Sequence, residues 1–321
     1  MSGLGAFVIT YDRPRVLAQT LSRLLGQTRA PDRIVVVNNG AREAVESLVA
    51  ELPATVEHVV TGRNLGPAGA ASIGVQRLLE LEVEWIYWGD EDDPPYHATD
   101  LEALMRLAHT SASDVGGVGA VGSRFDWRRG ELERLRDDEL HGVVEVDFIA
   151  GNSQFIERAE AARQAGPPDS RLFFGGYEVE QCLRIRRAGY RLLVDGDLMR
   201  RYREAAGRLR LAQQRQLVSQ YPVELLWRRY YRSRNYVFMM SRRFGRSDLA
   251  LRESLKAVAR CVASFRRGTR YGAVFTRAQL LGIVDGWRAR MGPTMASRPK
   301  AGVEVKREEI PASSGALGRP E

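Results

Sequence analysis

The stretch EWIYWGDEDD, residues 84–93, decides the fold, because an apolar run ends abruptly in four acidic residues. Residues 85–88 have the length and composition of a buried strand. The carboxylates of residues 90–93 crowd negative charge at its end, and a divalent cation that also binds a diphosphate would relieve the repulsion. Asp90 and Asp92 point to the same side of an extended chain, so we expect them to form the metal-binding pair. The alternative is a solvated acidic turn.

Strand and helix patterns alternate around this stretch. Strands are predicted at residues 5–10, 33–37, 55–60 and 84–89, and the helices between them begin at residue 14, at about residue 41 and within the loop 62–70. Strands separated by such helices predict a parallel sheet with right-handed crossovers. In such sheets ligands bind beyond the carboxyl ends of the strands. We therefore expect the polar residues at four strand ends to converge, namely 10–12, 38–39, 63–64 and 90–93.

The second half of the chain carries fewer clear signals. Strands are predicted at 117–122, 143–150 and 190–194, with an irregular loop at 124–142 and helices near 157–165 and 177–188. Amphipathic helices rich in arginine follow, and the residues from 293 onward have the composition of a disordered tail. The predicted organisation is a catalytic α/β domain over 1–200, a basic helical region over 201–292 and a tail over 293–321.

The net charge of +8 is unevenly distributed. Residues 200–270 hold 18 Arg and one Lys against four acidic residues, an excess of +15, which leaves the rest of the chain at −7. A basic part of this kind indicates partners that bear phosphate. Two distant cysteines favour a reducing compartment. No apolar run is long enough to span a bilayer, so we expect a cytoplasmic protein, with peripheral contact at the inner face of the membrane as an alternative.

Five motifs occur in an order that resembles inverting glycosyltransferases of family 2, which have the GT-A fold, a Rossmann-like and mostly parallel sheet. The likeness covers about residues 5–200 and looks closest to rhamnosyl- and galactofuranosyltransferase-like members. Its motifs are VITYDRP (8–14), VVNNG (36–40), RNLG (63–66), the strand with its acidic cluster (84–93) and FFGGYEVEQCLR (173–184).

The resemblance implies a role for each motif. Thr10, Tyr11, Asp12 and Arg13 with Asn38 would bind the nucleobase and ribose end of a nucleotide-sugar, and Arg63 and Asn64 would lie beside the diphosphate or ribose. Asp90, Glu91 and Asp92 would be the DXD motif, with Asp92 the main ligand of Mn²⁺ or Mg²⁺. Simple turn residues or surface ion pairs are the alternatives for Asn38 and Arg63.

The fifth motif would supply the general base that takes the proton of the acceptor hydroxyl during inverting transfer. Alignment on Arg184 puts Glu178 at the catalytic position, with Glu180 as the second candidate. The residues at these positions differ from the acidic pair that is usual in the family. A carboxylate at a helix start also has a structural explanation, because it interacts favourably with the helix dipole. The family's late histidine is missing too, since all four histidines precede residue 142.

The segment WRRYYRSRN, residues 227–235, resembles one that follows the catalytic domain in the same relatives. Its aromatic and arginine side chains are predicted to contact the sugar of the acceptor, a phosphate or a membrane surface. A helix that covers the core, with arginine stems lying on apolar surface, is the simpler interpretation.

The sequence therefore predicts an enzyme that transfers a sugar from a UDP- or dTDP-linked donor, such as galactofuranose or rhamnose, to an acceptor hydroxyl with inversion. The acceptor would be a glycan, a lipid-linked molecule or a small molecule. One alternative is a nucleotidyltransferase, but the first strand lacks a Gly-rich, basic phosphate loop. Another is a nucleic-acid-binding protein, but the arginines lie outside any recognised module and the acidic cluster would repel a nucleic-acid backbone.

Overall fold

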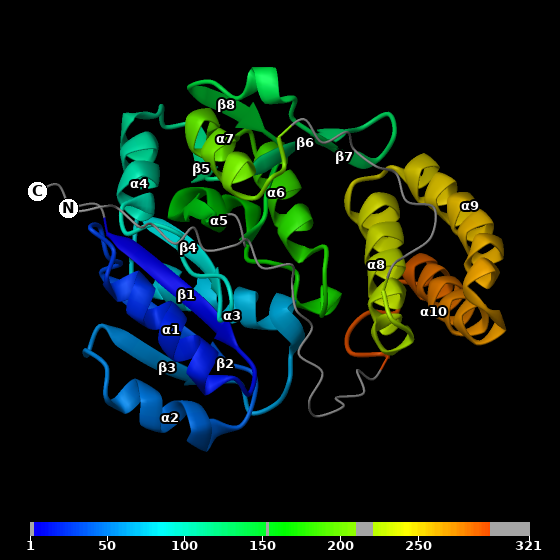
Figure 1. Ribbon diagram of the computed structural model, residues 1–321, viewed down its shortest axis with the longest axis horizontal. Coiled ribbons are helices and arrows are strands. Elements are labelled where there is room, and N and C mark those ends of the chain that lie inside the picture. Colours follow the sequence, from blue (N-terminus) through cyan, green and yellow to red (C-terminus); the bar gives the residue numbers. More distant parts are fainter. Residues whose placement is uncertain (1–2, 152–153, 210–220, 296–321) are drawn as a thin grey trace, which may run out of the picture.

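The computed structural model describes residues 3–151, 154–209 and 221–295. An eight-stranded sheet crosses the larger part of the molecule, and helices cover both of its faces (Figure 1). The strand order is β3-β2-β1-β4-β10-β5-β11-β8. Four of its seven strand pairs are parallel, so the predicted α/β class with a mostly parallel sheet is confirmed.

The first four strands are parallel and are joined by helices, as the sequence predicts. The strands are β1 (Leu4–Thr10), β2 (Arg33–Asn38), β3 (Val56–Val60) and β4 (Trp85–Asp90), and the helices are α1 (Pro14–Leu25), α2 (Arg42–Ala50) and α3 (Gly66–Glu80). Pro14 opens α1, where its missing N–H costs no hydrogen bond. The register pairs Thr10 with Asn38 and Ile9 with Asp90, so three strands end at one level.

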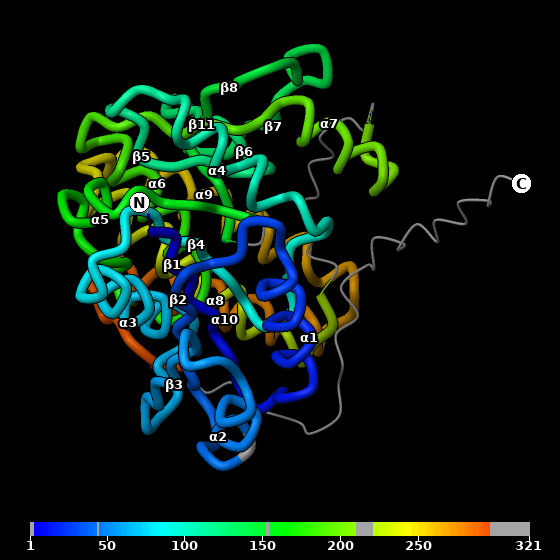
Figure 2. Tube along the Cα trace, turned by 90° about the vertical axis from the view of Figure 1, so that its left-hand side faces the viewer, coloured from blue at the N-terminus to red at the C-terminus, as the bar shows by residue number. Residues whose placement is uncertain are grey.

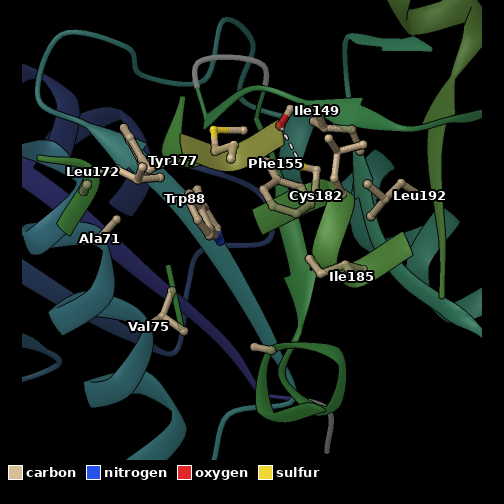
Figure 3. Close-up of a cluster of buried hydrophobic side chains, with 14 of the residues drawn as sticks. Ala71, Val75, Trp88, Ile149, Phe155, Leu172, Tyr177, Cys182, Ile185 and Leu192 are labelled. Carbon is tan, nitrogen blue, oxygen red and sulfur yellow. Dashed lines mark hydrogen bonds between the residues drawn. The ribbon is translucent and has the colours of Figure 1, made fainter. Parts of the chain in front are cut away.

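Two apolar layers sandwich the sheet, because successive side chains of a strand point to opposite faces. Leu4, Ala6 and Val8 of β1 pack with α1, α2 and α4 (Asp100–Thr110). Phe7 and Ile9 belong to the other layer, with α3, α5 (Ala159–Ala165) and α6 (Tyr177–Arg187). Figure 3 shows this second layer around Trp88, whose ring packs against Phe155 and Tyr177, while the thiol of Cys182 donates to the carbonyl of Ile149.

The second half of the sheet differs from the prediction. The expected strand 117–122 is two strands, β5 (Val115–Gly119) and β6 (Gly122–Asp126), and the expected strand 143–150 divides into β8 (Val143–Val146) and β9 (Phe148–Ile149). The expected loop 124–142 contains β7 (Glu131–Arg134), which forms a small antiparallel sheet with β6 and β9. Residues 157 and 158, predicted as the start of a helix, belong to β10 (Ile156–Arg158), an antiparallel strand between β4 and β5.

The described residues from 221 onward are mainly helical. Their helices are α8 (Trp227–Phe238), continued by a π-helical turn at Met239–Arg243, α9 (Ser247–Ser264) and α10 (Thr269–Trp287), and α8 lies along α10. Figure 1 shows this group to the right of the sheet, and in Figure 2, which is viewed from the left-hand side of Figure 1, it lies behind the first strands. After β11 (Arg191–Asp195), α7 (Gly196–Ala205) runs across the expected domain boundary at residue 200. In the described part of the chain, no helix is both long and apolar enough to cross a membrane.

The predicted tail is described only at its beginning. Residues 296–321 lie outside the described residues. Thr294 and Met295, which we expected to be disordered, contact α8: Tyr230 hydrogen-bonds to Thr294, and the hydroxyl of Tyr231 donates to the carbonyl of Met295 (2.8 Å). The ordered chain therefore extends at least to residue 295.

Candidate active site

Glu91 joins the ends of β1 and β4. Its side chain is buried, and its oxygens accept hydrogen bonds from the Thr10 hydroxyl, the Tyr11 backbone N–H (3.0 Å) and Arg13 Nε (2.5 Å). The Thr20 hydroxyl donates to its carbonyl (2.5 Å). Burial raises the pKa of Glu91, while the hydrogen bonds from Thr10 and Tyr11 and the charge of Arg13 oppose that shift. Glu91 therefore holds the turn after β1 in place, and its contact with a nucleotide-sugar stays a prediction.

Arg13 connects this buried carboxylate to Asp92. Its Nη1 and Nη2 atoms each lie 3.2 Å from Asp92 Oδ2, and the side chain of Asp92 is partly exposed. Asp90 is the last residue of β4 and is also partly exposed. Arg13 thus balances part of the negative charge that made the acidic cluster conspicuous in the sequence.

The donor set of this cluster fits a metal that takes few protein ligands. Among the described residues, no three His, Cys, Asp or Glu side chains are grouped so that they could hold a metal ion. Asp90 and Asp92 nevertheless offer carboxylate oxygens at one strand end, and Mg²⁺-type sites on nucleotides commonly use only one or two protein carboxylates with phosphate oxygens and water.

Asp12 ties the turn after β1 to the turn after β2. It adopts a positive φ of 55°, and its Oδ1 accepts a hydrogen bond from the backbone N–H of Ala41 (2.7 Å). A Cβ atom on Gly40 would collide with this carboxylate, so only glycine fits there. The motif that begins at Thr10 and the NNG turn are therefore parts of one structure.

The two asparagines after β2 are both buried. Asn38 Nδ2 donates to the carbonyl of Ala41 (3.0 Å), and its Oδ1 accepts from the N–H of Gly40 (2.9 Å). Asn39, which we expected at the converging strand ends but without a role of its own, donates to the carbonyl of Gly66 (3.0 Å). Their side chains therefore fix the turns that line the strand ends.

The loop before α3 contains the other two expected residues. Asn64 Oδ1 accepts from the N–H of Gly66 (2.8 Å), which shapes the start of the helix. Arg63 is exposed, and no hydrogen bond or ion pair to its guanidinium is found within the described residues. Among the expected nucleotide-binding residues, Tyr11, Asp12, Arg13, Arg63 and Asn64 are exposed. Asp12, Arg13 and Asn64 use their side chains in hydrogen bonds within the turns, whereas none is found for the side chains of Tyr11 and Arg63 in the described part of the chain.

Glu178 lies beside the carboxyl end of β4. Three of the four residues before Tyr177 have a positive φ: Phe173 (59°), Gly175 (72°) and Gly176 (80°). Tyr177 then stacks on Trp88 of β4 at 6.3 Å between ring centroids. Glu178 Oε1 accepts a hydrogen bond from the backbone N–H of Gly151 (2.6 Å). The stack places this carboxylate at the same edge of the sheet as the acidic cluster.

Glu180 has a different environment. It is buried, and its Oε1 lies 2.8 Å from Arg184 Nε and 3.0 Å from Arg243 Nε. Burial raises its pKa, whereas the two arginines oppose that rise. Residues 178 and 180 are separated by about 200° around a helix. Glu180 therefore holds α6 to the π-helical turn, and this ion-pair cluster argues against the base role that we expected as an alternative.

The segment 227–235 holds the loop before Glu178 in place through side-chain hydrogen bonds. Asn235 Nδ2 lies within hydrogen-bonding distance of the carbonyls of Leu172 (2.9 Å), Phe174 (3.0 Å) and Gly175 (2.7 Å), and Arg234 Nη2 also donates to Leu172 (2.8 Å). The side chains of both residues are buried, as are Tyr230 and Tyr231. These four residues are therefore closed to lipid, and the simpler expectation of a helix covering the core describes them.

Tyr202 occupies the region where the family's histidine is missing. Its hydroxyl donates to Asp100 Oδ2 (2.7 Å), and Gln154 Nε2 donates to the same hydroxyl (2.7 Å). The ring of Tyr202 meets Tyr96 edge-on at 5.0 Å, shortly after the acidic cluster. No periodic pattern in the sequence predicts this network, which joins α7 to α4.

Part of the chain is similar in sequence to known glycosyltransferases. Residues 6–158 match the family model described as Glycosyl transferase family 2. Galactofuranosyltransferase GlfT1 of Mycolicibacterium smegmatis is 32% identical over 197 residues, which are 57% of this chain and 65% of that protein. GlfT1 of Mycobacterium tuberculosis is 33% identical over 196 residues, 57% of this chain and 64% of that protein. The alignments thus span less than two thirds of these relatives.

A solved structure supports the fold independently. The mannosyltransferase PcManGT from Pyrobaculum calidifontis, in complex with GDP-Man and Mn²⁺, superimposes with a TM-score of 0.53 at 15% identity, over 89% of this chain and 87% of that one. The expected GT-A architecture is confirmed by this likeness together with the sheet order.

Proposed function

We propose that this chain transfers a sugar from a nucleotide-diphosphate sugar to an acceptor hydroxyl with inversion, since residues 6–158 match the model of glycosyl transferase family 2. The observation that carries the proposal is the position of Glu178. The Tyr177–Trp88 stack holds it beside the strand whose end bears Asp90 and Asp92. An acidic pair for the diphosphate and a separate carboxylate for the acceptor are the two parts that such a reaction needs.

Glu178 is the proposed general base. The acceptor oxygen forms a bond to the anomeric carbon while the bond from that carbon to the diphosphate oxygen breaks, and the acceptor proton passes to the Glu178 carboxylate. The nucleoside diphosphate leaves with the bonding electron pair. The hydrogen bond from Gly151 orients the carboxylate for this transfer.

The donor lies, in this proposal, across the ends of β1, β2 and β4. Exposed Tyr11 contacts the nucleobase or ribose and exposed Arg63 the diphosphate, while buried Thr10, Asn38 and Glu91 keep the turns in place. Asp92 and Asp90 would hold Mn²⁺ or Mg²⁺. When bound there, the cation would neutralise charge on the leaving diphosphate. Arg13 can serve the same purpose through its place beside Asp92.

The sugar proposed for transfer is galactofuranose from its UDP-linked donor, since the relatives at 32% and 33% identity are galactofuranosyltransferases. dTDP-rhamnose is the comparison donor. The proposed acceptor is a hydroxyl of a glycan or of a lipid-linked sugar.

A thermal-shift panel tests the proposal. The protein is heated with UDP, dTDP, GDP, UDP-galactofuranose and dTDP-rhamnose, each with and without Mn²⁺. We expect a uridine ligand to raise the melting temperature in the presence of Mn²⁺, since a ligand that binds only the folded state stabilises it. An Asp92→Asn variant should lose the Mn²⁺-dependent part of the shift. If no diphosphate stabilises the protein with metal present, the proposal fails.

A further inference from the structure

Helix α9 and the 3-10 turn after it expose a continuous apolar stripe. The side chains of Leu251, Leu255, Val258 and Val262 of α9, and of Phe265 at the start of that turn, are between 48% and 71% exposed. Their spacing of four, three, four and three residues places them on one face of the helix. A different face of the same helix, which includes Ala257 and Cys261, is buried against the other C-terminal helices. The stripe is therefore a second apolar face that packing within the described chain leaves uncovered.

Helix α9 itself lies at the border of the molecule on the side away from β1, β2, β3 and β4 (Figure 1). The next helix continues the pattern, because Val274, Leu281 and Val284 of α10 are also exposed. Single exposed apolar residues are ordinary, but a contiguous group of them marks an interaction surface.

Positive charge surrounds this apolar surface. Residues 251–284, which include the stripe, contain seven basic residues and one acidic residue, Glu253. Arg260 pairs with Glu253 and Lys256 with Glu131, and the other basic residues are Arg252, Arg266, Arg267, Arg270 and Arg277. Arg266, Arg267 and Arg270 follow directly after Phe265 at the turn from α9 to α10, and all three are exposed. Arginines beside apolar side chains on a helical surface are the pattern of segments that lie in the interface of an anionic bilayer.

We propose that the stripe of α9 and the basic turn that follows it bind the surface of a membrane that contains anionic lipids. The apolar side chains would enter the boundary between headgroups and acyl chains, and the guanidinium groups would pair with lipid phosphates. A second copy of the chain fits less well, because a two-fold interface would bring the arginines of one copy against those of the other. The inference goes beyond the proposed glycosyl transfer and does not depend on it.

Flotation of the full chain with vesicles tests the inference. Vesicles of phosphatidylcholine alone are compared with vesicles that also contain phosphatidylglycerol, at low and at high salt. We expect flotation with the anionic vesicles and weaker flotation at high salt, where surface charges are screened. A double variant, Leu255→Glu with Val262→Glu, should lower the partition coefficient by about tenfold or more. An Arg266→Ala, Arg270→Ala variant should lower it by an order of magnitude as well, at about fivefold per arginine.

The matched control is Val143→Glu, which puts the same charge on an exposed valine of β8, outside the C-terminal helices. It should float like the unmodified protein, and all variants should keep their melting temperature and their shift with nucleotide. The inference is overturned if the unmodified protein stays in the soluble fraction at low salt, or if the double variant floats as well as the control. A dimer in light scattering that the double variant abolishes would overturn it in favour of self-association.

Discussion

Glu178 is the residue on which the chemistry depends. Glu178→Gln keeps the shape of the side chain and can still accept the hydrogen bond from Gly151, but it removes the proton acceptor. We expect turnover to fall by about 10²–10⁴-fold while the affinity for the donor stays unchanged. Single-turnover sugar transfer and donor titration measure the two effects. Glu160→Gln, at the start of α5, is the matched control, and equal losses in both variants would remove Glu178 from the role of base.

Glu91 is the second residue to which the structure gives a testable role. Glu91→Ala removes the acceptor shared by Thr10, Tyr11 and Arg13, so we expect the free energy of unfolding to fall by about 2 kcal/mol. Donor affinity should fall as well, because the turn after β1 loses its anchor. Urea unfolding and donor titration measure both quantities. Glu84→Ala, an exposed residue at the other end of the same strand, should change neither; a stable Glu91 variant would contradict the anchoring role.

At the scale of elements, α8 determines where the loop before α6 lies. Asn235→Ala removes an amide that contacts three loop carbonyls, and the loop contains the strained residue Phe173. The expected result is a fall in kcat of about tenfold with little change in donor KM, since a small displacement of a positioned group is costly while the donor site at the strand ends remains intact. Arg232→Ala, exposed on the same helix, is the control. Parallel loss of donor binding would show a wider structural defect instead.

The elements also show what the sequence could predict. The four strands and three helices of the first half could be predicted because turn residues bound each apolar run and each run packs against an element near it in the sequence. β10 could not be found in this way. It has three residues, and its buried Glu157 breaks an apolar pattern, so only the distant partners β4 and β5 define it as a strand. Likewise, the inward direction of Glu91 and the contacts of Asn235 depend on residues about 60 to 80 positions away.

At the scale of the whole molecule, polar side chains inside the two apolar layers connect parts that are far apart in sequence. Glu157 lies within the sheet, fully buried, and accepts hydrogen bonds from Trp88 Nε1 (3.0 Å) and Gln181 Nε2 (2.8 Å). It thereby connects the layer of α6 to β4, the strand whose end bears the acidic cluster. Burial raises the pKa of Glu157 to about 7, although both hydrogen bonds and Arg184 favour its charged form.

This shift makes global stability depend on pH in a definite direction. Between pH 4.5, the ordinary pKa, and about 7, the folded protein keeps a proton on Glu157 that the unfolded chain has released. Stability therefore falls as the pH rises through this window, by up to about 3 kcal/mol. Glu157→Gln should remove that part of the slope whatever its effect at a single pH, because an amide does not titrate. Urea unfolding at a series of pH values from 5 to 8 measures the difference between the two slopes. Parallel slopes would mean that Glu157 is already charged throughout this range, with its two donors and Arg184 outweighing the cost of burial.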